Sequence, residues 1–285
     1  KGSNIPHYQG LPSVLHDHGY RNLFFMTHES QYDNMNAFLR TNGYDDIYAQ
    51  ENYPRKEVVN SFGVPDHFLY RYALQKLQQQ KQPFMATLLS ISNHPPYVIP
   101  EWFHANSEEE ELQIVEYADD ALRIFFKQAA EQPWYGNSVF VLLGDHGKLT
   151  GSPECEMPQC LNHIPLIIYA PGLAPEEIDS WCMQMDVQPT LLSLLGIRAE
   201  QEHFGQNILQ KPRSMALYTA DNMIGARSDG HLYIYEPGTG TEWFYKSAAD
   251  NKVVYCEEPD STLLHMKRTL FSTLQTAQEE IKKHE

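Results

Sequence analysis

One stretch constrains the fold of this 285-residue chain more than any other: SVFVLLGDHG, residues 138–147. Its five consecutive apolar residues, Val139–Leu143, predict a short strand that is buried on both faces. Gly144 ends the run, and Asp145 and His146 follow at once. In open α/β sheets, ligands bind just beyond the carboxyl ends of the strands. A carboxylate and an imidazole at this point can therefore converge on one cation.

The rest of the chain shows helix and strand patterns in alternation for about 200 residues, which is typical of a layered α/β protein. Further strands are predicted at residues 22–27, 84–92 and 163–169. Helices are predicted at residues 11–20, from 33 or 34 to 43, 68–81, 107–132 and 186–195. We therefore expect a mainly parallel sheet with helices on both faces.

The helix predicted at 107–132 has the clearest pattern. Ser107 and Glu110 match a capping box. Its buried stripe is predicted to consist of Leu112, Val115, Ala118, Leu122, Phe125 and Ala129.

After Gly205 the pattern changes. HLYIYE and TEWFYK, joined by a glycine-rich turn, predict an antiparallel hairpin. An amphipathic pattern over residues 261–283 predicts a terminal helix. We expect three parts: an α/β domain at 1–204, a small antiparallel subdomain at 205–258 and a C-terminal amphipathic helix at 259–285.

Length and charge limit the classes of function. The length suits one large domain, or one domain with an appendage. The formal charge of −16 argues against binding to nucleic acid or to an anionic lipid surface, since both need clustered Lys and Arg. No apolar run approaches the roughly 20 residues that span a bilayer, and the first residues do not resemble a signal peptide. We expect any export signal or membrane anchor to lie outside this sequence.

Polar clusters follow two more of the predicted strands. Residues 28–34 follow the strand at 22–27, and Asn93-His94 follow the strand at 84–92. His163 begins the strand after the Asp-His pair. If these strands are neighbours in a parallel sheet, the first two clusters and the Asp-His pair share one edge.

Each candidate residue has a functional and a structural interpretation. Asp145 and His146 offer an oxygen and a nitrogen, a mixed set that suits manganese, zinc or magnesium better than calcium. The alternative is a capping aspartate beside a surface histidine. His94 can donate a proton or bind an anionic oxygen. The alternative is a loop histidine held among prolines.

The cluster at 28–34 is similarly open to two interpretations. Tyr32, Asp33 and Asn34 can contact the polar head of a substrate, or Asp33 or Asn34 can cap the next helix. His163 can support the site or contact substrate, or it can be merely the first residue of a strand. Asp119, inside a helix, is interpreted as structural.

Other signals are weaker or absent. Asp186, at a helix N-cap, is interpreted as structural. Cys155 and Cys160 enclose a four-residue loop and can form a disulfide or remain free thiols, and their spacing does not favour a zinc site. The sequence contains no GxSxG elbow and no GxGxxG or GxxxxGK[ST] loop.

VFVLLGDHG resembles the metal-binding strand end of the sulfatase and alkaline phosphatase superfamily. The resemblance is strongest to its branch of lipoteichoic-acid-synthase-like phosphoglycerol transferases. Other segments over residues 11–245 resemble that branch in the same order: LPSVLHDHGY, QYDNMNAFLRTNGYD, NSFGVPDHFLY, LLSISNHPPY, VEYADDAL, HIPLIIYAPG, QMDVQPTLLSLLGI, HFGQNIL and the closing hairpin. The resemblance implies that residues 1–204 form the C-terminal part of a catalytic domain.

The resemblance also implies a mechanism. In the family a Thr, or in sulfatases a modified Cys or Ser, attacks phosphorus or sulfur while a divalent metal neutralises charge. It implies one metal ion, manganese first, with zinc, magnesium or calcium as alternatives. Asp145 and His146 match the Asp-His ligand pair, and an acidic residue and the nucleophile complete the set. His94 matches a histidine that contacts the phosphoryl or glycerol group of the substrate.

Two departures accompany the resemblance. Tyr32 and Asn34 stand where lipoteichoic acid synthases carry a Trp and an Arg that grip glycerol phosphate, and a neutral Asn cannot replace an Arg–phosphate contact. The acidic ligand and the nucleophile belong upstream of LPSVLHDHGY, which begins here at Leu11. No CxPxR sulfatase signature occurs. The resemblance therefore implies half of a metal site, and a chain that is inactive by itself.

We expect a metal-dependent phosphoglycerol transferase or phosphodiesterase that acts on an anionic phospholipid or glycan of the cell envelope. It would work outside the cytoplasmic membrane, anchored by an N-terminal segment that this chain lacks. The alternatives are a sulfuric ester hydrolase and a non-catalytic module that binds an anionic envelope polymer.

Overall fold

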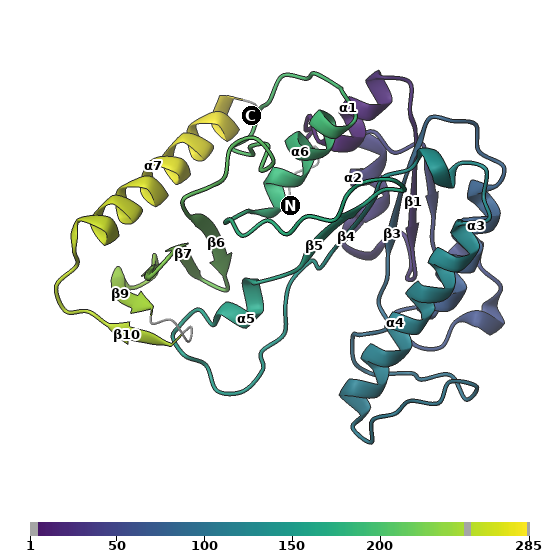
Figure 1. The fold of residues 1–285 in the computed structure, drawn as a ribbon, viewed down its shortest axis with the longest axis horizontal. Helices are drawn as coiled ribbons and strands as arrows, with labels where there is room; N and C mark the ends of the chain where they lie inside the picture. Colours follow the sequence, from purple (N-terminus) through teal and green to yellow (C-terminus); the bar gives the residue numbers. More distant parts are fainter. Residues whose placement is uncertain (1–4, 248–251, 284–285) are drawn as a thin grey trace. The chain divides into compact units, whose positions relative to one another are not determined.

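The computed structural model describes residues 5–247 and 252–283 of the chain (Figure 1). The chain divides into two compact units, unit 1 at residues 1–138 and unit 2 at residues 139–285. The domain boundaries predicted after residues 204 and 258 stay a prediction.

Unit 1 is an α/β unit. Its strands are β1 (Arg21–Met26), β2 (Asp46–Tyr48) and β3 (Phe84–Leu89). Its helices are α1 (Leu11–Asp17), α2 (Met35–Thr41), α3 (Asp66–Leu77) and α4 (Glu110–Ala129), with short 3-10 turns η1 (Tyr32–Asn34), η2 (Gln50–Asn52), η3 (Arg55–Glu57) and η4 (Tyr135–Asn137). β1 lies between β2 and β3, and both pairings are parallel, as the sequence predicts.

The central strand β1 is buried on both faces, which explains its uninterrupted apolar sequence. Phe24 and Met26 pack with Leu39 of α2 on one face. Phe25, whose side chain is completely buried, stacks on Tyr48 of β2, and Tyr48 in turn contacts Tyr72 of α3. The sheet is therefore packed between α2 and α3. This packing fixes the strand ends from which the residues of the candidate site follow.

α4 begins later than predicted. The carboxylate of Glu116 accepts hydrogen bonds from the backbone amides of Asn106 and Ser107, at 2.6 and 3.0 Å, and these bonds hold the two residues outside the helix. Ser107 instead accepts from the amide of Glu109. The predicted capping box between Ser107 and Glu110 is therefore wrong.

The buried face of α4 is also rotated from the predicted stripe. Ile114, Tyr117, Ala121, Phe125 and Ala129 are buried, so Phe125 and Ala129 are confirmed. Leu112 and Val115, in contrast, are 51% and 48% exposed. The reason is that Tyr117 and Phe125, the large side chains of the buried face, contact His67 and Tyr70 of α3.

Unit 2 contains β4 (Phe140–Leu143), β5 (Leu166–Tyr169) and an antiparallel sheet in the order β10-β9-β8-β7-β6. The sheet strands are β6 (Ala216–Ala220), β7 (Met223–Ser228), β8 (His231–Glu236), β9 (Thr241–Ser247) and β10 (Val253–Tyr255). The helices are α5 (Gln159–Asn162), α6 (Val187–Leu194) and α7 (Ser261–Lys283), with the 3-10 turn η5 (Gln184–Asp186) before α6. The predicted hairpin and terminal helix are confirmed.

β4, the strand that ends before the Asp-His pair, differs from the prediction in two respects. It pairs with β5 antiparallel, with Leu143 opposite Leu166. Leu143 is also 43% exposed, so β4 is not buried on both faces. The antiparallel pairing brings the residues before β5 to the end of β4 where the Asp-His pair lies.

Both faces of the antiparallel sheet are covered. Tyr233 and Ala226 pack under Leu263 and Met266 of α7, which lies along the sheet in Figure 1. On the opposite face, Met157 packs with Leu232, Ile234 and Tyr245. The segment around Met157 follows the Asp-His pair in sequence, so this sheet supports the loop that leaves the candidate metal site.

Asp186 stands at the N-cap of α6, where the sequence places it, but its side chain makes no capping hydrogen bond to that helix, and its structural role comes from other partners. Its carboxylate is fully buried and pairs with Arg213, which donates from Nε to Oδ2 at 2.6 Å and from Nη2 to Oδ1. The same carboxylate accepts from the amides of Met183 and Gln206, each at 2.8 Å. It therefore ties the start of α6 to the segment that leads into β6.

Among the helices of the described residues, none combines the length and the apolar character that a membrane-spanning segment needs.

Candidate active site

The strands of unit 1 deliver two histidines to the carboxyl edge of the parallel sheet. His28 lies two residues beyond β1, and His94 lies five residues beyond β3. The carbonyl of His28 accepts a hydrogen bond from the amide of Gln50, which follows β2. Residues from the ends of all three strands are therefore gathered at one edge, where parallel sheets place their sites.

The exposed side chain of His94 makes two contacts. The ring of Phe62 lies 4.3 Å away, measured between ring centroids. Nδ1 lies 2.7 Å from the carbonyl oxygen of Pro95. Because a carbonyl can only accept, Nδ1 is the donor in this contact, which leaves Nε2 for another partner.

The Tyr32–Asn34 segment forms the turn η1, and its side chains are available for contacts. Tyr32 is 58% exposed, and its ring lies 5.1 Å from the ring of His28. Asp33 and Asn34 both have left-handed backbone conformations, with φ of 47° and 62°. Asn34 stands at the N-cap of α2 but makes no capping hydrogen bond with its side chain. Capping of α2 by the side chain of Asn34, one of the two capping alternatives, is therefore wrong.

His28 is the residue of this edge to which the sequence interpretation gave no individual role. It is buried, in contact with Tyr32, and its Nδ1 lies 3.0 Å from the carbonyl of Glu29. The sequence does carry a signal for it, because His28 directly follows a buried strand, as His94 does. The turn beyond His28 is fixed by Glu51, which accepts hydrogen bonds from the amide and hydroxyl of Ser30.

In unit 2 the Asp-His pair presents two donor atoms to one point. Oδ2 of Asp145 and Nε2 of His146 lie 3.7 Å apart, and their side chains are 78% and 74% exposed. Oδ1 of Asp145 accepts from the amide of His146 at 2.8 Å. Nδ1 of His146 lies 2.8 Å from the carbonyl of Gly147, so the proton is on Nδ1 and Nε2 is free. A backbone carbonyl on the second nitrogen is the usual partner of a metal-binding histidine.

The donor set fits a divalent cation. At 3.7 Å, both atoms can reach one ion with bonds of about 2.1 Å, the length typical of zinc and magnesium. Within residues 5–247 and 252–283, no three His, Cys, Asp or Glu side chains are grouped to hold a metal ion. The pair can therefore supply two of the four or more ligands that such an ion takes.

Neighbouring segments hold the backbone of this pair. The side-chain amide of Gln184 donates to the carbonyls of Gly144 and Asp145, at 3.2 and 2.9 Å. On the other side, the amide of Gly147 donates to the carbonyl of Leu161. A Cβ on Gly147 would lie only 1.9 Å from the carbonyl oxygen of Cys160, so this close approach requires glycine.

His163 lies three residues before β5 and therefore at the same end of the β4–β5 pair as Asp145. Its side chain is exposed, and its amide closes α5 by donating to Gln159. Its position agrees with a role beside the metal pair. The predicted convergence of Asp145 and His146 with the clusters of unit 1 stays a prediction.

The four cysteines of the sequence are free thiols in the structure. The disulfide between Cys155 and Cys160 that the sequence left open is therefore not formed. Burial raises the pKa of the Cys155 thiol to about 11, which makes it a poor nucleophile at neutral pH.

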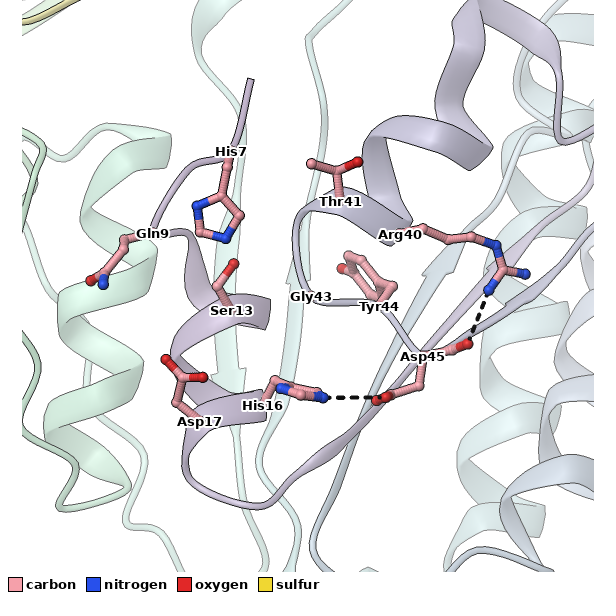
Figure 2. A pocket seen from close by; sticks show the side chains of 10 residues that line it. All are labelled: His7, Gln9, Ser13, His16, Asp17, Arg40, Thr41, Gly43, Tyr44 and Asp45. Atoms are coloured by element: carbon pink, nitrogen blue, oxygen red, sulfur yellow. Dashed lines mark hydrogen bonds and ion pairs between the residues drawn. The ribbon is translucent and has the colours of Figure 1, made fainter. Parts of the chain in front are cut away.

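Figure 2 shows a polar pocket of about 310 Å³ elsewhere in unit 1. His16 Nε2 lies 3.4 Å from a carboxylate oxygen of Asp45, and Arg40 donates to the carbonyl of the same residue. These residues precede β1 or β2, so the pocket lies at the amino edge of the parallel sheet. It is therefore at the opposite edge from His28 and His94.

The family to which the chain belongs is shown by its sequence over most of the α/β region. The Sulfatase family model matches residues 2–197, which is more than half of the chain. The chain belongs to the Sulfatase family. The resemblance recognised in the sequence is thereby confirmed, together with its alkaline phosphatase-like fold.

Lipoteichoic acid synthases of two bacteria are similar to it in sequence. Lipoteichoic acid synthase 1 of Bacillus subtilis is 28% identical over 265 residues, which cover 84% of this chain and 41% of that protein. The lipoteichoic acid synthase of Staphylococcus aureus strain USA300 is 26% identical over 236 residues, covering 74% and 36%. The chain thus spans about two fifths of the length of these relatives.

The solved structures agree. A protein of the alkaline phosphatase superfamily from Vibrio parahaemolyticus superposes with a TM-score of 0.83 and 26% identity, over 96% of this chain and 68% of that one. The lipoteichoic acid synthase LtaP of Listeria monocytogenes has the same fold, with a TM-score of 0.76 and 23% identity, over 96% and 72%.

Proposed function

We propose that this protein is a metal-dependent phosphoglycerol transferase or phosphodiesterase that acts on an anionic phospholipid or glycan of the cell envelope. The observation that carries the proposal is the 3.7 Å approach of Oδ2 of Asp145 and Nε2 of His146, in a Sulfatase-family chain whose relatives include lipoteichoic acid synthases. Asp145 and His146 would hold the cation, with manganese first and zinc, magnesium or calcium as alternatives. The cation, when bound, would neutralise negative charge on the oxygens of the transferred group.

The residues of unit 1 are proposed to bind and orient the substrate. With Nδ1 bonded to the carbonyl of Pro95, His94 can take a proton from an attacking hydroxyl group at Nε2. Donation to a leaving group would require its imidazolium form. Tyr32, Asp33 and Asn34 present an exposed ring and polar groups to the head of the substrate. His163 is proposed to contact substrate from unit 2.

The nucleophile and an acidic ligand are proposed to come from outside residues 1–285. Two ligand atoms are fewer than a divalent cation takes, and the relatives are more than twice as long as the region they share with this chain. We also propose that the active protein works outside the cytoplasmic membrane and is anchored there.

A sulfuric ester hydrolase is the second candidate, because the family model that matches bears the name Sulfatase. Sulfate and phosphate esters present similar tetrahedral oxyanions, so the cation and His94 would serve either reaction. The two candidates differ in the substrate that is turned over.

The proposal is tested by turnover in the full-length protein that carries this chain, with a phosphatidylglycerol-type diester and an aryl sulfate assayed in parallel. Asp145→Asn and His146→Gln are each expected to lower kcat/KM for the diester by at least about 100-fold, since even residues that only support a metal ligand contribute 10- to 100-fold. Asp119→Asn, at an exposed position on α4, is the matched control and should leave the rate unchanged.

Turnover of the aryl sulfate alone would replace the first candidate by the second. Diester turnover that survives both substitutions would contradict the metal role of the pair. If neither substrate reacts with the wild-type protein, and the protein still binds an anionic envelope polymer, a non-catalytic binding module would be favoured instead.

A further inference from the structure

The turn that carries His94 is joined to the first residue of α3 by two opposed sets of hydrogen bonds. Oδ1 of Asp66 accepts from the amides of Ile91 and Ser92, each at 3.0 Å. In return, the hydroxyl of Ser92 accepts from the amide of Asp66 at 3.1 Å. Three hydrogen bonds therefore connect the beginning of α3 to the two residues that lead from β3 toward His94.

This connection is buried and is supported from α4. Asp66 is 2% exposed, and burial raises the pKa of its carboxyl against the opposing effect of the Ile91 and Ser92 amides. Next to it, Nδ1 of His67 lies 2.6 Å from the hydroxyl of Tyr117, which is fully buried on α4. A buried polar group that loses its partner costs the full desolvation penalty. Breaking the hydrogen bonds between Asp66 and the two amides would therefore be costly in free energy.

The backbone of Ile91 is in turn hydrogen-bonded to His94. The amide of Ile91 is bound by Asp66, and its carbonyl accepts from the amide of His94 at 2.8 Å. The His94 ring then completes the turn through the contact of Nδ1 with the carbonyl of Pro95. Asp66 thus lies at the start of a continuous series of hydrogen bonds that ends at the imidazole.

We propose that Asp66 is a positioning residue for His94. It fixes the turn at residues 91–94 so that Nδ1 of the ring stays bonded to Pro95 and Nε2 stays free for the substrate. The substrate part of this inference rests on the function proposed for His94 above. Asp66 acts through this turn, since its carboxylate bonds to the amides of Ile91 and Ser92.

The direct test is the tautomer of His94, measured by long-range ¹H–¹⁵N NMR on the 285-residue chain. The wild type should show the proton on Nδ1. Asp66→Ala should shift the ring toward a mixture with the proton on Nε2 and speed exchange of the His94 amide. Asp66→Asn keeps an oxygen at the Oδ1 position and should restore the wild-type tautomer. A purely structural role would change stability without changing the tautomer of the folded protein.

A folded Asp66→Ala chain that keeps the wild-type tautomer and amide exchange would overturn the inference. If Asp66→Ala does not fold, Ser92→Ala, which removes the hydroxyl that accepts from the amide of Asp66, is measured in the same way. Its His94 amide should exchange faster than in the wild type, and an unchanged rate would overturn the inference.

Turnover in the full-length protein separates this inference from the proposed function. Asp66→Ala is expected to lower kcat/KM by up to about 100-fold, the effect of misplacing a reacting group by about 1 Å, and Asp66→Asn should restore most of it. If His94→Ala lowers turnover but Asp66→Ala does not, the positioning role fails and the function stands. If neither substitution lowers turnover, the role proposed for His94 fails, while the tautomer result still decides whether Asp66 fixes the turn.

Discussion

Replacing Arg213 by methionine is expected to lower the free energy of unfolding of unit 2 by about 3–5 kcal/mol, the usual cost of leaving one partner of a buried ion pair uncompensated. Asp186 is fully buried and would lose both of its bonds to the guanidinium. Two amides would still bind the carboxylate, but the positive charge of Arg213 would be lost. The measurement is chemical denaturation followed by circular dichroism, with the change read from the transition midpoint.

Two further variants identify the cause of the loss. Asp186→Asn combined with Arg213→Met removes both charges and should recover much of the stability, because the buried charge is then gone. Arg198→Met changes an exposed arginine of the same unit and should change the free energy by no more than about 0.5 kcal/mol. If Arg213→Met costs less than about 1 kcal/mol, or if the double variant is as unstable as the single one, the buried pair does not hold this segment.

The second large effect is expected at Gly63, where alanine should destabilise unit 1 by about 2–5 kcal/mol. The backbone there has a φ of +97°, and an added Cβ would lie 1.8 Å from the carbonyl oxygen of Thr27. A left-handed conformation costs an L-residue about 1–2 kcal/mol, and overpacking adds about 1–3 kcal/mol. Thr27 cannot move freely, because its carbonyl accepts a hydrogen bond from the amide of Val64.

Gly19→Ala is the matched control for this prediction. Gly19 also has a positive φ, of +81°, but an added Cβ there would meet no atom within 4 Å. It should therefore cost only the conformational part, about 1–2 kcal/mol. Equal losses of stability at the two positions, measured by denaturation, would show that the close approach to Thr27 does not matter.

The parts of the fold that the sequence predicts well are those in which local pattern and packing agree. Gly19 ends α1 with a positive φ, and the apolar run after Arg21 forms the buried central strand β1. α7 covers Ser261–Lys283, as its amphipathic pattern predicts. In each case the residues that determine the element are inside it or next to it.

The errors arise where distant residues decide. Glu116 binds the amides of Asn106 and Ser107 and so delays the start of α4, which no capping pattern can reveal. Tyr117 turns a different face of α4 toward α3 than the aliphatic residues indicate. The antiparallel pairing of β4 with β5 is likewise a property of the folded unit, because a short apolar run does not specify the direction of its neighbour.

The same distinction holds for the candidate site. The residue types of Asp145, His146 and His94 were recognised from motifs and from their places after strands. The groups that orient these residues lie far away in the sequence or carry no motif. Gln184 bonds to the backbone of Asp145. Phe62 contacts the ring of His94, and Asp66 binds the turn before it. Their roles depend on hydrogen bonds and ring contacts that only the folded chain supplies.

The most direct test of the central claim is to map manganese on the ¹⁵N-labelled 285-residue chain by paramagnetic line broadening. Because two ligands form a partial shell, binding should be weak, but the amide signals of Asp145, His146 and Gly147 should broaden first as Mn²⁺ is added. Asp145→Asn should abolish this broadening, whereas Asp119→Asn should preserve it. Broadening that begins at the glutamates of residues 108–111 and spares residues 145–147, or that survives Asp145→Asn, would contradict the assignment of this pair as a metal site.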